Sequence, residues 1–595
     1  MTEVPPPKDT DVPPSDRGKR PGVPAEEDPV ARFDARVLDP ATAVRILDGK
    51  PLKPTIYRNN RLVVNAKDRA ELGAILKAID GVLAEMSAWA DGRPRQSYRR
   101  RNADPWSPMR QPDGARSDSS IEPDREWQDQ ARRLRRAEEN KVPLAAVVSL
   151  EPAGPDRFAP QTPIDVLEVV QRLRAKVTRP LPGGLAVPVP PEARVGLEHL
   201  LFVTINLAPY GASLAPYGAS LAPYGASLAP YGASLAGIPL NRSAGGGVFS
   251  YLAPGTGGRT PVSLVLEVPD VPLDGPRAVV LDTGCEEKHP WFAEKVDRRV
   301  AVDEGNGVQS VIGMDVDLAS SVETDPEGNA CAPDLMTGAI PPVCGHGTFI
   351  TGILRQKAPS AQISSLRIVG PDGVVPEGAL STAVTEILIK HKQELDKSNG
   401  VTGWLDALVL SLGYYLETDD DPENSSASEH SALGTLLAEL ASLGVAIFAS
   451  AGNDSTTRPF YPAAFAVDPR FTAKNCVPLV SVAAENPDQS IALFSNDGDW
   501  VTAQAPGASL VSSLPTVMCG GWQPDVSIIG PGNRVRSTID PDQYSGGFGL
   551  WSGTSFAAPV VAGDFLAGLA AHAPQASLKE RRAIVQGLAG LRRTD

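Results

Sequence analysis

Three residues in the C-terminal half of the sequence have the side chains and surroundings needed for hydrolysis by a serine nucleophile. Ser555 lies in WSGTSFAAPVVAG, where small residues precede an apolar, alanine-rich stretch typical of a buried helix. His346 lies in GHGTFITGIL, between two glycines that would let a substrate approach its ring, and Asp282 ends the strand-like segment AVVLD. Such hydrolysis needs a nucleophile, a base and a group that orients the base. We therefore expect these three residues to act together.

The segments around these residues predict the elements that would position them. After Pro276, short apolar segments such as SSLRIV, LDALVLSLG, VAIFASAGN and LVSVAA alternate with glycine-rich turns and helical stretches. This pattern predicts an α/β fold with a parallel sheet that helices cover on both faces. Asp282 would lie at the carboxyl edge of the sheet, where α/β folds place their sites. Ser555 would lie at a helix N-terminus, whose dipole favours developing negative charge.

The order of these motifs resembles the subtilisin family of serine proteases. DTG with the following His289 and Pro290, then GHGT, then GTSFAAP occur in the order Asp, His, Ser. The segments SLG and SAGN also match, and the resemblance covers about residues 277–585. It implies a serine endopeptidase that forms an acyl-enzyme on protein or peptide substrates. It also implies that Asn453 donates to the oxyanion and that substrate is bound along Ser411, Leu412, Gly413, Ser450, Ala451 and Gly452.

Two alternatives to an active, unregulated protease remain open. A subtilisin-like scaffold could be catalytically silent and serve only for binding, although none of the catalytic residues is missing. The protease could instead be held latent by its N-terminal region, which is then a candidate regulatory part or the docking site of a regulatory partner. Taken singly, Asp282 would be interpreted as a turn residue and Ser555 as a helix cap. The occurrence of all the motifs in the family's order favours the enzyme.

The first 206 residues carry no recognisable chemistry. Residues 1–30 are proline-rich and charged, which predicts a disordered tail. Residues 31–206 predict a small α/β or α+β domain, with strands at 61–66, 144–150 and 197–205 and helices at 68–86 and 163–175. A polar stretch, residues 91–140, interrupts it. The basic cluster RPRQSYRRR at its start is expected to be a solvated loop rather than a nucleic-acid site.

Four perfect copies of LAPYGAS occupy Leu207–Ser234. A coiled coil is excluded, because the proline and glycine of each copy cost about 3 and about 1 kcal/mol in a helix. We expect a loop or linker over residues 207–236, since added loop length costs little entropy. The other interpretation is a docking or autoprocessing segment that displays its four tyrosines. Residues 237–276 would connect this segment to a peptidase domain at 277–595.

Composition limits the partners and the compartment. The formal net charge of −15 argues against a basic nucleic-acid-binding surface. No apolar leader opens the chain and no run of about 18 apolar residues occurs, so we expect neither export nor a membrane span. Five cysteines do not make a disulfide framework in a chain of this length. Together these features predict a cytoplasmic protein.

Two smaller features leave alternatives open. Cys285 and Cys344 should both lie near the catalytic residues, where we expect buried reduced thiols rather than a redox-sensitive pair. No cofactor is expected, although structural calcium is common among the relatives. The acidic stretch ETDDDPE, residues 417–423, could contribute calcium ligands, but its spacing fits no defined loop and favours a solvated surface segment.

Overall fold

A computed structural model describes the two halves of the chain and the contact between them. The predicted tail up to residue 28 and the LAPYGAS repeats lie outside the described residues. The described residues are 29–40, 43, 52–88, 97–101, 106, 125–153, 164–177, 194–203, 258–265, 271–286, 288–292, 296–297, 301–303, 309–311, 325–328, 331, 333, 338, 340–418, 431–571 and 576–590.

A seven-stranded parallel sheet forms the centre of the C-terminal half. Most of its strands are short and fully buried, as their apolar sequences require when helices cover both faces. The predicted parallel α/β sheet is therefore confirmed. In spatial order the strands are β17 (Ala503–Pro506), β16 (Leu479–Glu485), β15 (Ala446–Ser450), β13 (Ala407–Leu410), β7 (Arg277–Asp282), β11 (Gln362–Arg367) and β8 (Val296–Asp297).

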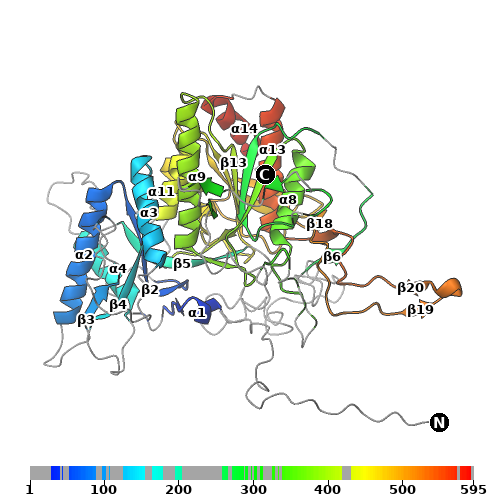
Figure 1. Ribbon diagram of the computed structural model, residues 1–595, viewed down its shortest axis with the longest axis horizontal. Helices are drawn as coiled ribbons and strands as arrows, with labels where there is room; N and C mark the ends of the chain where they lie inside the picture. Colours follow the sequence, from blue (N-terminus) through cyan, green and yellow to red (C-terminus); the bar gives the residue numbers. More distant parts are fainter. Residues whose placement is uncertain are drawn as a thin grey trace, which may run out of the picture.

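Helices cover both faces of this sheet (Figure 1). On one side, α13 (Thr554–Ala571) packs on β13, β15 and β16 and against α8 (His346–Lys357) and α14 (Leu578–Gly590). On the other side lie α9 (Glu377–Lys397) and α11 (Ala432–Ser442). Among the described residues, α13 alone is long and apolar enough to cross a membrane by length and composition. Since 67% of that stretch is buried inside the body, it is typical of a core helix.

The N-terminal half forms an antiparallel sheet with its own helices. The structure confirms the strands and helices expected there, but it also has a strand and a helix inside the stretch expected to be polar loop. The described end of the basic cluster is a strand rather than a loop: Ser97–Arg100 form β3, which pairs with β4 (Leu144–Ala153), and Arg100 pairs with Asp80 at 2.6 Å. The elements are α1 (Pro29–Arg32), β1 (Ala35–Val37), β2 (Ile56–Ala66), α2 (Arg69–Ala88), β3 (Ser97–Arg100), α3 (Arg125–Glu139), β4 (Leu144–Ala153), α4 (Val166–Val177) and β5 (Val195–Val203).

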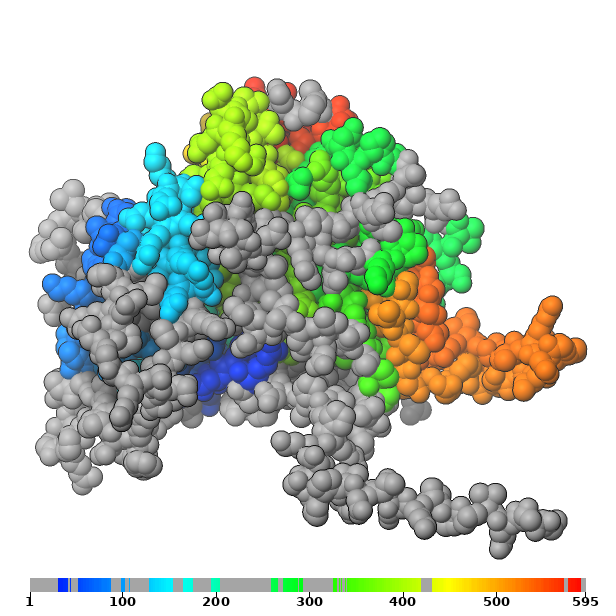
Figure 2. All heavy atoms as spheres, viewed as in Figure 1, coloured from blue at the N-terminus to red at the C-terminus, as the bar shows by residue number. Residues whose placement is uncertain are grey.

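This antiparallel sheet lies directly against the C-terminal half (Figures 1 and 2). α2 and α4 pack on β2 from one side, whereas α9 and α11 of the C-terminal half contact β2, β4 and β5. The sheet also continues into the C-terminal half, because β5 pairs antiparallel with both β12 (Val374–Pro376) and β14 (Leu412–Gly413). The two halves thus share one sheet.

Small β elements complete the C-terminal half. A protruding hairpin, β19 with β20, extends from the body beside the sheet that contains β18 (Figures 1 and 2). The remaining elements are β6 (Thr260–Pro261), β9 (Ala301–Asp303), β10 (Gln309–Val311), η7 (Ala463–Val467), α12 (Pro469–Thr472), β18 (Leu510–Ser513), β19 (Ser527–Ile529), η8 (Pro531–Asn533), β20 (Val535–Ser537) and β21 (Phe548–Trp551).

Candidate active site

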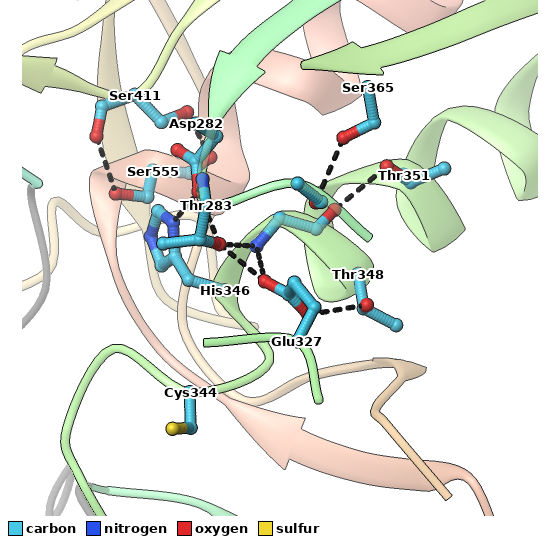
Figure 3. A network of polar contacts seen from close by, with 12 residues as sticks. Asp282, Thr283, Glu327, Cys344, His346, Thr348, Thr351, Ser365, Ser411 and Ser555 are labelled. Atoms are coloured by element: carbon cyan, nitrogen blue, oxygen red, sulfur yellow. Dashed lines mark hydrogen bonds and ion pairs between the residues drawn. The ribbon is translucent and has the colours of Figure 1, made fainter. Parts of the chain in front are cut away.

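Asp282 and His346 form a buried pair at the carboxyl edge of the central sheet (Figure 3). Asp282 is the last residue of β7, and His346 is the first residue of α8. The His346 Nδ1 atom donates to Asp282 Oδ1 at 2.7 Å, which leaves Nε2 as the basic nitrogen of the ring. Nε2 is buried and makes no hydrogen bond to the residues that the structure describes. In this arrangement Nε2 could accept a proton from a neighbouring hydroxyl group.

The glycines beside His346 have a packing role that their sequence motif does not reveal. A Cβ on Gly347 would overlap the carbonyl oxygen of Gly284, and a Cβ on Gly345 would lie 2.7 Å from Pro515 Cδ. Gly345 also has a φ of 80°, in the left-handed region that favours glycine. Gly347 therefore allows the start of α8 to approach the Asp282 loop closely, and Gly345 allows it to pack against Pro515.

Ser555 lies in the first turn of α13, beside the segment expected to bind substrate. Its hydroxyl donates to the carbonyl oxygen of Ser411 at 3.4 Å, and the Ser411 hydroxyl donates to the Ser555 carbonyl at 2.9 Å (Figure 3). The His346 ring packs against Trp551 and Phe556, with centroid separations of 5.7 and 5.3 Å, and these two rings also contact each other at 4.9 Å. Asp282, His346 and Ser555 are all 0% exposed. The structure thus brings the three predicted residues to one buried region.

Asn453 is anchored to the residue that precedes Ser555. Its Oδ1 atom accepts hydrogen bonds from the Thr554 N–H at 2.9 Å and from the Thr554 hydroxyl at 2.8 Å. Thr554 also accepts the Gly452 N–H at 3.1 Å, and Ala451 N–H donates to Val482 in the neighbouring strand. The SAGN segment, which begins at Ser450, is therefore fixed beside the first turn of α13, with the oxygen end of the Asn453 amide bound to Thr554.

The segment expected to bind substrate backbone is paired with the N-terminal half. Gly413 pairs with Phe202 and Leu412 with Val203, both in antiparallel register. On the other side of β5, the Val203 N–H donates to the Gly373 carbonyl at 3.0 Å. The end of β5 therefore lies between two strands of the C-terminal half, directly beside Ser411.

Two buried charged residues near His346 were not found from the sequence. The Glu327 carboxyl group bonds to Thr283 and to the first turn of α8. The Arg259 guanidinium donates to the carbonyls of Pro341, Pro342 and Cys344, and these bonds hold the loop that leads into α8. The same guanidinium lies 4.8 Å from the Trp551 ring centroid. Neither residue stands in a motif, so no sequence signal marked them.

A buried ionic cluster joins the two halves, around His199 of β5. The two ring nitrogens of His199 contact Glu377 at 3.2 Å and Glu417 at 3.1 Å, and Arg174 pairs with Glu417 at 2.9 Å. Burial alone would lower the pKa of His199, but its hydrogen bonds to Glu377 and Glu417 raise that pKa to about 9. Burial acts to raise the pKa of Glu417, yet Arg174 and His199 hold it well below its usual range.

The same cluster corrects the interpretation of the acidic stretch that begins at Glu417. We expected a solvated segment, but Glu417 is buried. Residues 419–423 lie outside the described residues. Within the described ranges, no three His, Cys, Asp or Glu side chains converge to hold a metal ion. Calcium binding therefore remains a prediction without identified ligands.

All five cysteines carry free thiols, and four of them are buried. Cys285 and Cys344 are both among the buried ones, as expected for reduced thiols. The pKa of Cys331 is raised well above its usual value by burial, and a hydrogen bond with Cys344 adds to the effect. Cys344 thus has a thiol neighbour in Cys331, a pairing that the spacing of the cysteines did not indicate.

Comparison with known proteins connects this geometry to a family. Residues 275–589 match the model of the subtilase family, Peptidase_S8. Minor extracellular protease Epr of Bacillus subtilis (strain 168) is 28% identical over 173 residues, which cover 28% of this chain and 22% of that protein. Subtilisin-like protease 1 of Arthroderma gypseum is 25% identical over 224 residues, which cover 37% of this chain and 34% of that protein. The chain thus spans about a fifth and about a third of these two relatives.

Two solved structures are also similar. A cold adapted subtilisin-like serine proteinase is 20% identical with a TM-score of 0.33, covering 55% of this chain and 87% of that one. A lanthipeptide protease is 18% identical with a TM-score of 0.33, covering 52% and 78%. The family model alone matches more than half of the sequence, at residues 275–589. The chain therefore belongs to the subtilase family.

Proposed function

We propose that this chain is a serine endopeptidase in which Ser555 attacks the peptide carbonyl. His346 Nε2 takes the proton of the Ser555 hydroxyl, and Asp282 holds the ring in the required tautomer and stabilises the imidazolium that forms. The tetrahedral intermediate collapses as His346 returns the proton to the leaving amine. Water then attacks the acyl-enzyme by the reverse proton transfers, which frees Ser555.

Asn453 is the side chain that we assign to the oxyanion. Its Oδ1 atom is bound by Thr554, so the Nδ2 donors lie at the other end of a fixed, planar amide next to Ser555. The Ser555 backbone N–H, in the first turn of α13, would be the second donor, supported by the helix dipole. A preorganised donor costs no rearrangement when charge develops.

The observation that carries this proposal is the 2.7 Å bond between His346 and Asp282 in a buried region that also holds Ser555. Hydrolysis of an unfolded protein such as casein by the full chain tests it, with Ser555→Ala as the matched control. We expect wild type to release new amino termini and Ser555→Ala to release none above background. Equal release by both proteins would favour the catalytically silent scaffold.

We further propose that the N-terminal half holds the peptidase latent. Three observations support this: β5 pairs with β14, the cluster around His199 ties the two halves together, and the catalytic residues are buried from solvent. Substrate backbone would need the same edge of Leu412 and Gly413 that β5 occupies. A substrate can therefore bind only when β5 leaves.

The register of β5 also suggests where the chain would cut itself. The strand ends at Val203, paired with Leu412, and the preceding residue, Ser411, contacts the Ser555 hydroxyl. We expect a first self-cleavage within residues 203–206, detected by sequencing the amino termini of the purified chain after incubation. Ser555→Ala should stay intact there. Cleavage only far from residues 203–206 would contradict the register argument without affecting the assignment of Ser555.

A further inference from the structure

The Glu327 carboxyl group is buried from solvent and lies next to Thr283, the residue that follows Asp282 (Figure 3). Its Oε1 atom contacts the Thr283 hydroxyl and accepts the Gly347 N–H at 3.0 Å. Its Oε2 atom accepts the Thr348 hydroxyl at 2.6 Å. Since the residue that caps α8 is a glycine with no side chain, Glu327 supplies an acceptor for one free N–H group of the first turn, that of Gly347.

The Thr283 hydroxyl connects Glu327 to Asp282. Thr283 Oγ1 lies 3.0 Å from Asp282 Oδ1, touches Glu327 Oε1 and accepts the Gly347 N–H at 2.8 Å. A hydroxyl group has a single proton to donate. It can therefore serve the Asp282 carboxylate or the Glu327 carboxylate, but not both.

The protonation of Glu327 decides which carboxyl group receives that proton. When Glu327 is protonated, its Oε1–H donates to Thr283 Oγ1 and Thr283 donates to Asp282 Oδ1, so both contacts of the Thr283 hydroxyl are hydrogen bonds. When Glu327 loses its proton to solvent, the Thr283 hydroxyl turns to Glu327. Asp282 then keeps the Thr283 N–H, at 2.8 Å, and the His346 ring as donors.

The surroundings of Glu327 favour the protonated form near neutral pH. Burial raises the pKa of Glu327 to about 8; hydrogen bonds from Thr283 and Thr348 oppose the rise, and the charges of Asp325 and Asp282 add to it. Among the described residues, four charged or titratable groups face Glu327: Asp282, Asp325, Arg367 and the thiol of Cys331. Asp325 and Arg367 pair with each other at 3.3 Å.

We propose that Glu327 is a positioning residue for the reaction at Ser555, acting through Thr283 on the Asp282–His346 pair. The inference rests on the proposed serine-peptidase function. Ionised Glu327 withdraws a hydrogen bond from Asp282 and adds a buried negative charge, and both changes favour the imidazolium form of His346 in the transition state. The attack by Ser555 therefore becomes faster as Glu327 ionises.

The test is the pH profile of covalent labelling of Ser555 by a fluorophosphonate, in the full-length chain, for wild type and Glu327→Gln. The docked N-terminal half slows both proteins alike, so the ratio of the two labelling rates isolates the effect of Glu327. We expect a ratio near one at pH 6, rising by roughly three- to tenfold through pH 8 in favour of wild type. A ratio that stays constant from pH 6 to pH 9.5 would overturn the proposal.

Three controls separate positioning from a general structural effect. Glu286→Gln removes another buried carboxylate nearby, one that bonds Thr516 rather than Thr283. Its labelling rate, divided by that of Glu327→Gln, should rise through pH 8 as the wild-type ratio does; this rise is called the step below. Thr283→Ser should keep the step and Thr283→Val should reduce it, since only serine retains the hydroxyl. A full step in Thr283→Val would contradict transmission through Thr283. Absence of any Ser555 adduct both in wild type and in Val203→Pro, which weakens the pairing of β5, would instead overturn the proposed function itself.

Discussion

The backbone of Phe202 pairs with that of Gly413, so a strand of the N-terminal half runs along the edge that we propose for substrate binding. The pairing continues into Val203 and Leu412 and stops beside Ser411, which contacts Ser555. One set of backbone donors and acceptors cannot bind two strands at once. Under the proposed latency, β5 and a substrate strand would therefore compete for this one edge.

Weakening the end of β5 should activate the full-length chain. Val203→Pro removes the N–H that donates to Gly373, and the proline ring disfavours the paired conformation. Losing a buried backbone hydrogen bond costs about 1–3 kcal/mol, so we expect the initial hydrolysis of a short peptide substrate to rise roughly 5- to 150-fold. Val203→Ala keeps the N–H and should stay close to wild type. Indistinguishable rates for all three proteins would contradict the proposed latency.

The contact between the two halves should weaken at alkaline pH. The pKa of His199 rises from 6.5 to about 9 in the folded chain. The stability that the protonated ring gives to the folded chain is therefore fully present below about pH 6.5 and is lost as the pH rises through about 9. The melting temperature of wild type should therefore fall further between pH 6.5 and pH 9.5 than that of His199→Gln, which carries no titratable ring. Parallel pH dependence of the two proteins would show that the protonated ring does not stabilise the contact.

Glu327 should make the folded chain less stable as pH rises. Because its pKa is raised from 4.5 to about 8 by burial, the unfolded chain ionises first, and stability falls progressively between about pH 4.5 and pH 8. At about 1.4 kcal/mol for each pKa unit, the expected loss is several kcal/mol. Glu327→Gln should avoid it, so the difference between the two melting temperatures should widen over that range in favour of the variant. A constant difference would mean that Glu327 is already ionised at pH 5.

Removing the Asn453 amide should lower turnover much more than substrate affinity. Asn453→Ala would take away a donor that acts only when the oxyanion forms, so we expect kcat to fall about 10²- to 10³-fold with little change in KM. That magnitude is the one known for the corresponding amide of subtilisin, a member of the same family. Steady-state kinetics on a peptide ester would measure both constants. A raised KM at unchanged kcat would assign Asn453 to substrate binding instead.

The sequence predicted the central sheet and the places of Asp282 and Ser555 in it because both depend on local patterns. The apolar segment AVVLD ends at Asp282, and the small residues before Ser555 precede a helix start. By contrast, the pairing of Phe202 with Gly413 joins residues more than 200 positions apart, and no periodicity encodes it. Glu327 was missed for the same reason, since its importance comes from Thr283 and α8, which only the fold brings near. Glu417 was misinterpreted because its acidic neighbours suggested solvent, whereas Arg174 and His199 bury it.

The central claim is that Ser555 is an activated nucleophile. Incubation of the full-length chain with a fluorophosphonate, followed by peptide mapping by mass spectrometry, tests it directly, with Ser555→Ala as the control and Val203→Pro to expose the site. We expect one adduct on Ser555, formed faster in Val203→Pro than in wild type, and none in Ser555→Ala. If Ser555 stays unmodified in both wild type and Val203→Pro while the protein is folded, the chain is not a serine peptidase.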